Sequence, residues 1–178
     1  FAIDGSYSFG KDRTLPQGCV AYFPEGVSYG PLLRPPGYQE IRCMFTGASN
    51  SMYISNAQRK VAIESLKKRG TIEEGVFTWY DEKGGKHNKD AGEAVWEEVF
   101  GRKMTYPAPR YGDVVIMNPH NCEWMPVPDV PGVSTKWLAS FTERQTRVGF
   151  IRLDPGAVWQ AGRADATDLL FLAEGTIS

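Results

Sequence analysis

The sequence predicts a mainly β fold of the sandwich or jelly-roll type, interrupted by a short helical insertion. Many short apolar segments follow one another at near-regular spacing, separated by turns rich in Gly and Pro. Two predicted helices, at 57–69 and 91–100, lie inside this pattern as an insertion and do not alternate strictly with the strands. A parallel α/β sheet is therefore disfavoured.

The first fifty residues predict short strands joined by tight turns. Cys19–Phe23 and Ile41–Phe45 are apolar runs, and the prolines and glycines of Pro24–Gly26 and Pro35–Gly37 lie between them. Because Gly and Pro favour turn conformations, these positions mark the ends of the strands.

Two helices are expected in the middle of the chain. Residues 57–69 contain no Gly or Pro and gather basic side chains at their C-terminal end, where the helix dipole favours them. Gly70 is a typical stop signal. The second helix is expected at 91–100. Between them, 75–80 reads as a strand and the charged segment 81–90 as a mobile surface loop.

The last third of the chain returns to β structure. Residues 126–133 hold three prolines and predict a loop or an edge. Turn residues at Asp154–Gly156 separate the last two predicted strands. The predicted strands are Asp113–Met117, Trp137–Phe141, Arg147–Leu153 and Asp168–Ala173.

Composition is that of a soluble globular protein, and it excludes several function classes. The formal net charge of −1 over 178 residues gives no field that would attract nucleic acid or an anionic membrane. Three cysteines without local spacing argue against a disulfide framework and a thiolate zinc site. With no membrane-length apolar run and no recognisable signal peptide, a cytoplasmic protein is expected. Its first and last residues, Phe1 and Ser178, suggest a piece of a longer chain.

A frame of fixed spacings runs through the last thirty residues. Gly156 is followed after five residues by Gly162 and Ala164, then by Asp168 and finally by Gly175. The spacing resembles the first conserved motif of the cupin superfamily, in which a His-x-His pair, an acidic residue and a second glycine follow the first glycine. Here the two histidine positions carry Gly and Ala.

A second frame precedes it. Gly112 is followed by Asn118 and His120 at the positions of a Pro-x-Gly pair, and then by Glu123. This segment resembles the second cupin motif, with Glu123 at the position of the third metal histidine. The order of the two frames implies a bicupin similar to the cupin domains of anti-sigma factors and related dioxygenases. The first unit would span 1–142, with its helical insertion near 57–100, and an incomplete second unit would span 143–178.

The first motif of the first unit has two possible registers. One uses Glu40 and puts Arg34 and Pro36 at the histidine positions. The other, which we favour, puts Tyr53 and Ser55 there. Neither register supplies a histidine pair.

The resemblance normally implies a metal held by three histidines and one carboxylate. The chain has only His87 and His120, and His87 falls in the predicted loop. We therefore predict no cofactor and no metal ligands, and a hard divalent cation bound through oxygen remains the open alternative.

The best candidates for proton chemistry are His120 and Glu123, because an imidazole near a carboxylate can exchange protons around neutral pH. A turn hydrogen bond and a surface charge are the competing explanations for these two residues. Aromatic and acidic side chains are candidates for lining a pocket, and core packing is equally open for the tryptophans. The candidate substrate-binding residues are Tyr53, Trp124, Trp159 and Asp168.

These observations lead to a cupin-fold protein that binds a small organic molecule in its barrel. Its chemistry would be that of a metal-independent isomerase, cyclase or lyase. The alternatives are a metal-dependent dioxygenase with ligands outside these residues, and a non-catalytic sensor or scaffold. The expected partners are a small-molecule ligand and a second copy in a homodimer, with no nucleic acid and no membrane.

Overall fold

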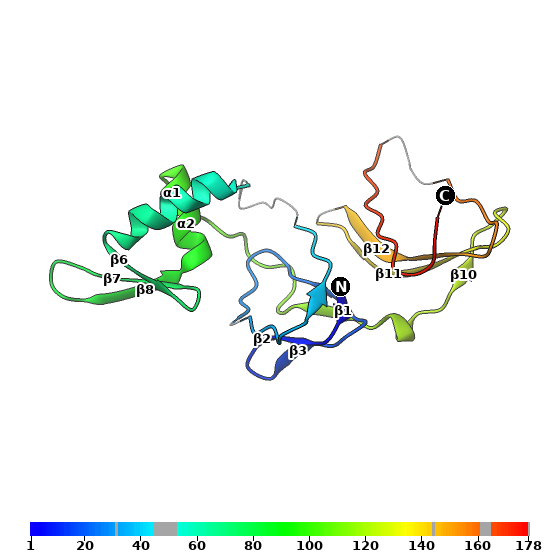
Figure 1. Cartoon of the computed structure of the whole chain (residues 1–178), viewed down its shortest axis with the longest axis horizontal. Coiled ribbons are helices and arrows are strands. Elements are labelled where there is room, and N and C mark those ends of the chain that lie inside the picture. The colour runs from blue at the N-terminus through cyan, green and yellow to red at the C-terminus, as the bar shows by residue number, and fades with distance from the viewer. Residues whose placement is uncertain (31, 45–52, 144, 161–164, 178) are drawn as a thin grey trace. The chain divides into compact units, whose positions relative to one another are not determined.

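The computed structural model describes residues 1–30, 32–44, 53–143, 145–160 and 165–177 (Figure 1). Within these ranges the chain is mainly β, with small antiparallel sheets, two α-helices and one turn of 3-10 helix. It divides into two compact units, Phe1–Asn118 and Pro119–Ser178. We call them unit 1 and unit 2 and describe each by itself.

Unit 1 contains three two-stranded antiparallel sheets, which pair β1 with β5, β2 with β3 and β4 with β9. A cluster of buried side chains includes Ala2, Tyr7, Phe9, Leu15 and Cys19. Of the two apolar runs predicted as strands in this segment, Cys19–Phe23 contributes to this cluster. The strands are β1 (Ala2–Asp4), β2 (Tyr7–Gly10), β3 (Arg13–Leu15), β4 (Val20–Tyr22), β5 (Gln39–Glu40) and β9 (Val115–Met117).

Unit 1 also contains two helices that pack on a three-stranded antiparallel sheet of order β6-β7-β8 (Figure 1). Leu66, Phe77 and Trp96 belong to the buried cluster between these layers. The elements are α1 (Asn56–Lys67), β6 (Gly70–Glu73), β7 (Val76–Tyr80), β8 (Lys86–Asp90) and α2 (Ala91–Phe100).

Local signals define the ends of both helices. Ser55 and Gln58 form a capping box at the start of α1, which satisfies backbone N–H groups that have no partner within the helix. Asp90 caps the start of α2, and Gly101 ends it in the left-handed conformation at φ +63°.

Unit 2 is built on one three-stranded antiparallel sheet of order β10-β11-β12. The long strands β11 (Val133–Phe141) and β12 (Thr146–Leu153) pair along their whole length, with an irregularity between Trp137 and Ala139. The short strand β10 (Met125–Pro126) adds to β11, and the 3-10 turn η1 (Pro119–Asn121) precedes it.

Both predicted helices are confirmed, and so are several strands. Residues 75–80 correspond to β7, and the predicted strands at Asp113–Met117, Trp137–Phe141 and Arg147–Leu153 correspond to β9, β11 and β12. A turn follows β12, as predicted, with Gly156 at φ +81°.

Three local predictions are wrong. Residues 81–90 are not a loop throughout, because Lys86–Asp90 forms β8 and pairs with β7. Asp168–Ala173 forms no strand and lies exposed, since its apolar side chains find no neighbouring strand in the described residues. Ile41–Met44 is likewise not a strand, and Phe45 lies outside the described residues.

No barrel closes among the described residues, so the coarse prediction of a mainly β fold is confirmed and barrel closure is not. The predicted boundary between 142 and 143 falls in the turn joining β11 to β12, whereas the two compact units divide after Asn118. None of the helices in the described part of the chain is long and apolar enough to cross a membrane.

Candidate functional site

One face of the unit 2 sheet gathers aromatic and cationic side chains. Ser134 pairs with Arg152 and Lys136 pairs with Phe150, so these four side chains lie on the same face of β11 and β12. Pro126 pairs with Ser134. Trp124 directly precedes β10, and its ring contacts Lys136 and Arg152. We call this surface the Trp124 face; it consists of Trp124, Pro126, Ser134, Lys136, Phe150 and Arg152.

Two cations contact the indole ring on this face. The Lys136 ammonium lies 4.9 Å and the Arg152 guanidinium carbon 4.7 Å from the centroid of the Trp124 ring. Lys136 Nζ also donates a hydrogen bond to the carbonyl oxygen of Pro119, at 3.0 Å. Cation–π contacts orient both groups without neutralising their charge.

Neither cation has an acidic counter-ion in the part of the chain that the structure describes. The ion pairs found there involve other side chains, and no described carboxylate lies within ion-pairing distance of Lys136 or Arg152. The Trp124 face therefore offers two positive charges to a negatively charged group from solution.

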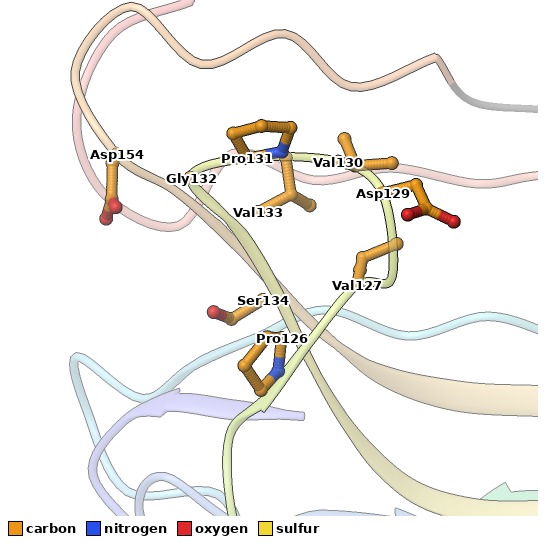
Figure 2. Close-up of a pocket in the computed structure, with 9 residues that line it drawn as sticks. All are labelled: Pro126, Val127, Asp129, Val130, Pro131, Gly132, Val133, Ser134 and Asp154. Carbon is orange, nitrogen blue, oxygen red and sulfur yellow. The ribbon is translucent and has the colours of Figure 1, made fainter.

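A depression of about 530 Å³ lies at the end of the same sheet, around the loop between β10 and β11 (Figure 2). Its wall shares Pro126 and Ser134 with the Trp124 face. Most of its lining side chains are apolar, and the polar side chains are one hydroxyl and two carboxylates. The lining residues are Pro126, Val127, Asp129, Val130, Pro131, Gly132, Val133, Ser134 and Asp154.

Backbone contacts hold the rim of the depression in place. Asp154 N donates to Gly132 O at 2.8 Å, one step beyond the last pair of the β11–β12 ladder. Ala157 N then donates to Asp154 O at 2.9 Å and closes the turn. Gly132 lies at φ +72°, where a side chain is strained, and a Cβ there would lie 3.0 Å from the Cβ of Ala157, a tight contact.

Three predicted site residues lie at or beside the Trp124 face. Trp124 is part of it, and Glu123 is the exposed residue next to it in sequence. His120 is exposed on η1, and the hydrogen bond from Lys136 to the carbonyl of neighbouring Pro119 fixes that turn beside the sheet.

The other three do not join them. Tyr53 belongs to unit 1 and is 81% exposed. Trp159 is half-buried beyond the turn after β12, and Asp168 is exposed in the C-terminal segment. Within the described residues, neither makes a ring contact or hydrogen bond to the Trp124 face.

The two registers considered for the first motif have different outcomes. Arg34 Nη2 lies 3.2 Å from Glu40 Oε1, so two positions of the less favoured register meet in an ion pair. In the favoured register, Ser55 is occupied as the N-cap of α1. The predicted motif positions Gly162 and Ala164 lie outside the described residues.

Sequence reasoning missed an imidazole–carboxylate pair in unit 1. His87 lies on β8, its ring stacks on Trp79 at 5.2 Å, and its Nε2 lies 2.8 Å from Asp81 Oδ2. The hydrogen bond from His87, together with backbone N–H groups of Gly85 and Lys83, lowers the pKa of Asp81. The Gly84-Gly85 turn was the available signal, since it makes 76–80 and 86–90 readable as a hairpin.

The described residues contain no group of three or more His, Cys, Asp or Glu side chains placed to share a metal ion. Comparison of the chain with protein-family models, curated proteins and solved structures gives no match.

Proposed function

We propose that the chain binds a small organic anion with an apolar body on the Trp124 face of unit 2. The observation that carries this proposal is the Trp124 ring with Lys136 and Arg152 against it, two cations that have no described acidic partner. An anionic ligand would supply the missing counter-charge.

Physical chemistry favours a carboxylate or similar oxyanion at this position. A guanidinium presents paired N–H donors that match the two oxygens of a carboxylate. Contact with the indole ring holds Arg152 in place, so less side-chain freedom is lost when a ligand binds. The adjoining depression offers apolar surface for the rest of the molecule, as ligand sites commonly do.

His120 and Glu123 would add proton transfer to this binding site. Both are exposed and lie at the chain segment leading into Trp124, so a ligand on the face could meet them. An imidazole titrates near neutral pH and can serve as acid and base in one cycle. The proposed chemistry is a metal-independent isomerisation, cyclisation or elimination.

For the fold, we propose that the sheets of this chain represent a cupin-type jelly roll whose metal site has been lost. The small antiparallel sheets and the two motif frames support this proposal.

A binding titration tests the site. The probes are 3-phenylpropanoate and its neutral amide, measured by calorimetry and by Trp fluorescence at low salt. We expect the acid to bind and the amide to bind at least about tenfold more weakly, since a charged hydrogen bond contributes about 1.5–3 kcal/mol. Arg152→Gln should remove this difference.

Arg147→Gln is the matched control. Arg147 also lies against a tryptophan of the same sheet, 3.7 Å from the centroid of Trp137, but outside the Trp124 face. The control should bind 3-phenylpropanoate as the wild type does. Equal loss of binding in both variants, or equal binding of acid and amide by the wild type, would contradict the proposed function.

A further inference from the structure

We infer that the ligand of the Trp124 face is a zwitterion of the amino-acid type, with an apolar side chain. This inference rests on the proposed function and adds a second recognition element to it. Arg152 and Lys136 would bind the carboxylate of the ligand, and Asp154 would bind its ammonium group.

The strand geometry places the two charges on one side of the sheet. Arg152 lies in β12 opposite Ser134, and Asp154 follows two residues later. The hydrogen bond from Asp154 N to Gly132 O continues the ladder, so the alternation of side chains extends to Asp154. At a rise of about 3.3 Å per residue, their Cα atoms are about 7 Å apart. Because the Arg152 guanidinium lies against Trp124, the carboxylate of the ligand would lie on the Trp124 side and its ammonium toward Asp154.

The two charges do not neutralise each other. The Arg152 guanidinium lies against Trp124, and no ion pair joins it to Asp154. Asp154 and Asp129 both line the depression, and neither has an ion-pair partner among the residues that the structure describes. The site therefore presents unneutralised charges of both signs on neighbouring parts of its surface, and Figure 2 shows its two carboxylates, Asp129 and Asp154.

This arrangement discriminates between classes of organic anion. A dianion on Arg152 and Lys136 would bring its second negative charge toward two carboxylates, and like charges repel. A monoanion would leave Asp154 without a partner. An amino acid satisfies both signs, and an apolar side chain can contact Val127 and Val130 in the wall of the depression.

The test compares matched ligands that differ by one charged group. L-Phenylalanine carries both charges, 3-phenylpropanoate lacks the ammonium, and 2-phenylethylamine lacks the carboxylate. L-Leucine and 4-methylpentanoate form a second pair with a smaller body. Calorimetry at low salt should give a dissociation constant at least about tenfold lower for an amino acid than for its partner acid.

Asp154→Asn assigns the effect to a residue. The variant should bind L-phenylalanine at least about tenfold more weakly than the wild type and bind 3-phenylpropanoate at least as tightly, because a nearby negative charge has been removed. Asp154→Glu keeps the charge and should retain the preference for the amino acid. Glu174→Gln, which removes an exposed carboxylate elsewhere in unit 2, is the control and should change neither constant. Circular dichroism confirms that each variant is folded.

The possible failures are distinguishable. If both acids bind through Arg152 and their amino acids bind no more tightly, the zwitterion inference is overturned and the proposed anion site stands. The same holds if Asp154→Asn weakens acid and amino acid equally. If no probe shows binding that depends on Arg152, the proposed function fails, and this inference fails with it.

Discussion

Tryptophan is used differently in the two units. In unit 1, Trp96 is buried in a cluster with Leu66 and Phe77, between two helices and a sheet. In unit 2, Trp124 is half-buried and Trp137 is 43% exposed. Cations contact the rings in both units, since the Arg102 guanidinium carbon lies 4.7 Å from the Trp96 centroid, so exposure of the ring is what differs. The comparison indicates that unit 1 gains stability from apolar burial, whereas unit 2 presents its rings and charges to solvent.

The difference in burial predicts which residues stabilise the fold and which bind the proposed ligand. Both clusters of buried hydrophobic side chains in the described residues belong to unit 1. In unit 2, the buried hydrophobic side chains among the described residues are Val133 and Phe141. Substitutions in the unit 1 clusters should therefore change unfolding, and substitutions on the Trp124 face should change binding with little effect on stability.

The largest effect is expected from Leu66→Ala. Leu66 is 2% exposed at the centre of a unit 1 cluster, and truncating such a side chain removes burial and leaves a cavity. The free energy of unfolding should fall by about 2–5 kcal/mol in a denaturant titration. Val61→Ala on the same helix, 71% exposed, is the control and should change it by less than about 0.5 kcal/mol. Similar losses in both would contradict the comparison.

Gly149→Ala tests the sheet of unit 2. A Cβ at this position would lie 2.5 Å from the Lys136 carbonyl oxygen and 2.7 Å from the Trp137 ring, so strand or ring must move. We expect a loss of about 1–3 kcal/mol in unfolding free energy. Gly112→Ala, where a Cβ would meet no atom within 4 Å, should be near neutral. A neutral Gly149→Ala would show that the tryptophan ring is not packed against the sheet.

Ser55→Ala tests the start of α1. Its hydroxyl oxygen accepts a hydrogen bond from Gln58 N at 3.2 Å, and its loss leaves that donor without a partner. The unfolding free energy should fall by about 1 kcal/mol, measured by circular dichroism in urea. Ser55→Asp keeps a side-chain acceptor for Gln58 N and should therefore retain most of the wild-type unfolding free energy. If the unfolding free energy of Ser55→Ala equals that of the wild type, water satisfies the Gln58 N–H as well as the serine does.

The smallest effect is a pH dependence in the β7–β8 hairpin. The hydrogen bond from His87 lowers the folded-state pKa of Asp81 below its unfolded value of about 3.9. The ionised Asp81 carboxylate therefore contributes fully to stability above its unfolded-state pKa. This contribution is lost as the pH falls through the folded-state pKa. The stability difference between wild type and Asp81→Asn should shrink from pH 6 toward pH 3. Parallel stability curves would show that the pair contributes nothing.

Part of the candidate site was predictable from sequence. His120 and Glu123 were identified from one motif frame and Trp124 as an aromatic candidate beside them, and two cations contact the Trp124 ring. Nothing in the sequence marked the two cations, Lys136 and Arg152, as site residues. They lie 12 and 28 positions from Trp124, and only strand pairing brings them to it.

By itself the sequence determined the local features, because these depend on neighbours along the chain. It predicted a mainly β chain, the helices at α1 and α2, and the turn after β12, from caps, Gly and Pro positions and apolar runs. Tertiary structure decided which strands pair. Apolar content alone predicted the wrong structure for two segments. The charged run Lys86–Asp90 became a strand because β7 supplies its hydrogen bonds, while the apolar run 168–173 gained no partner and stayed exposed.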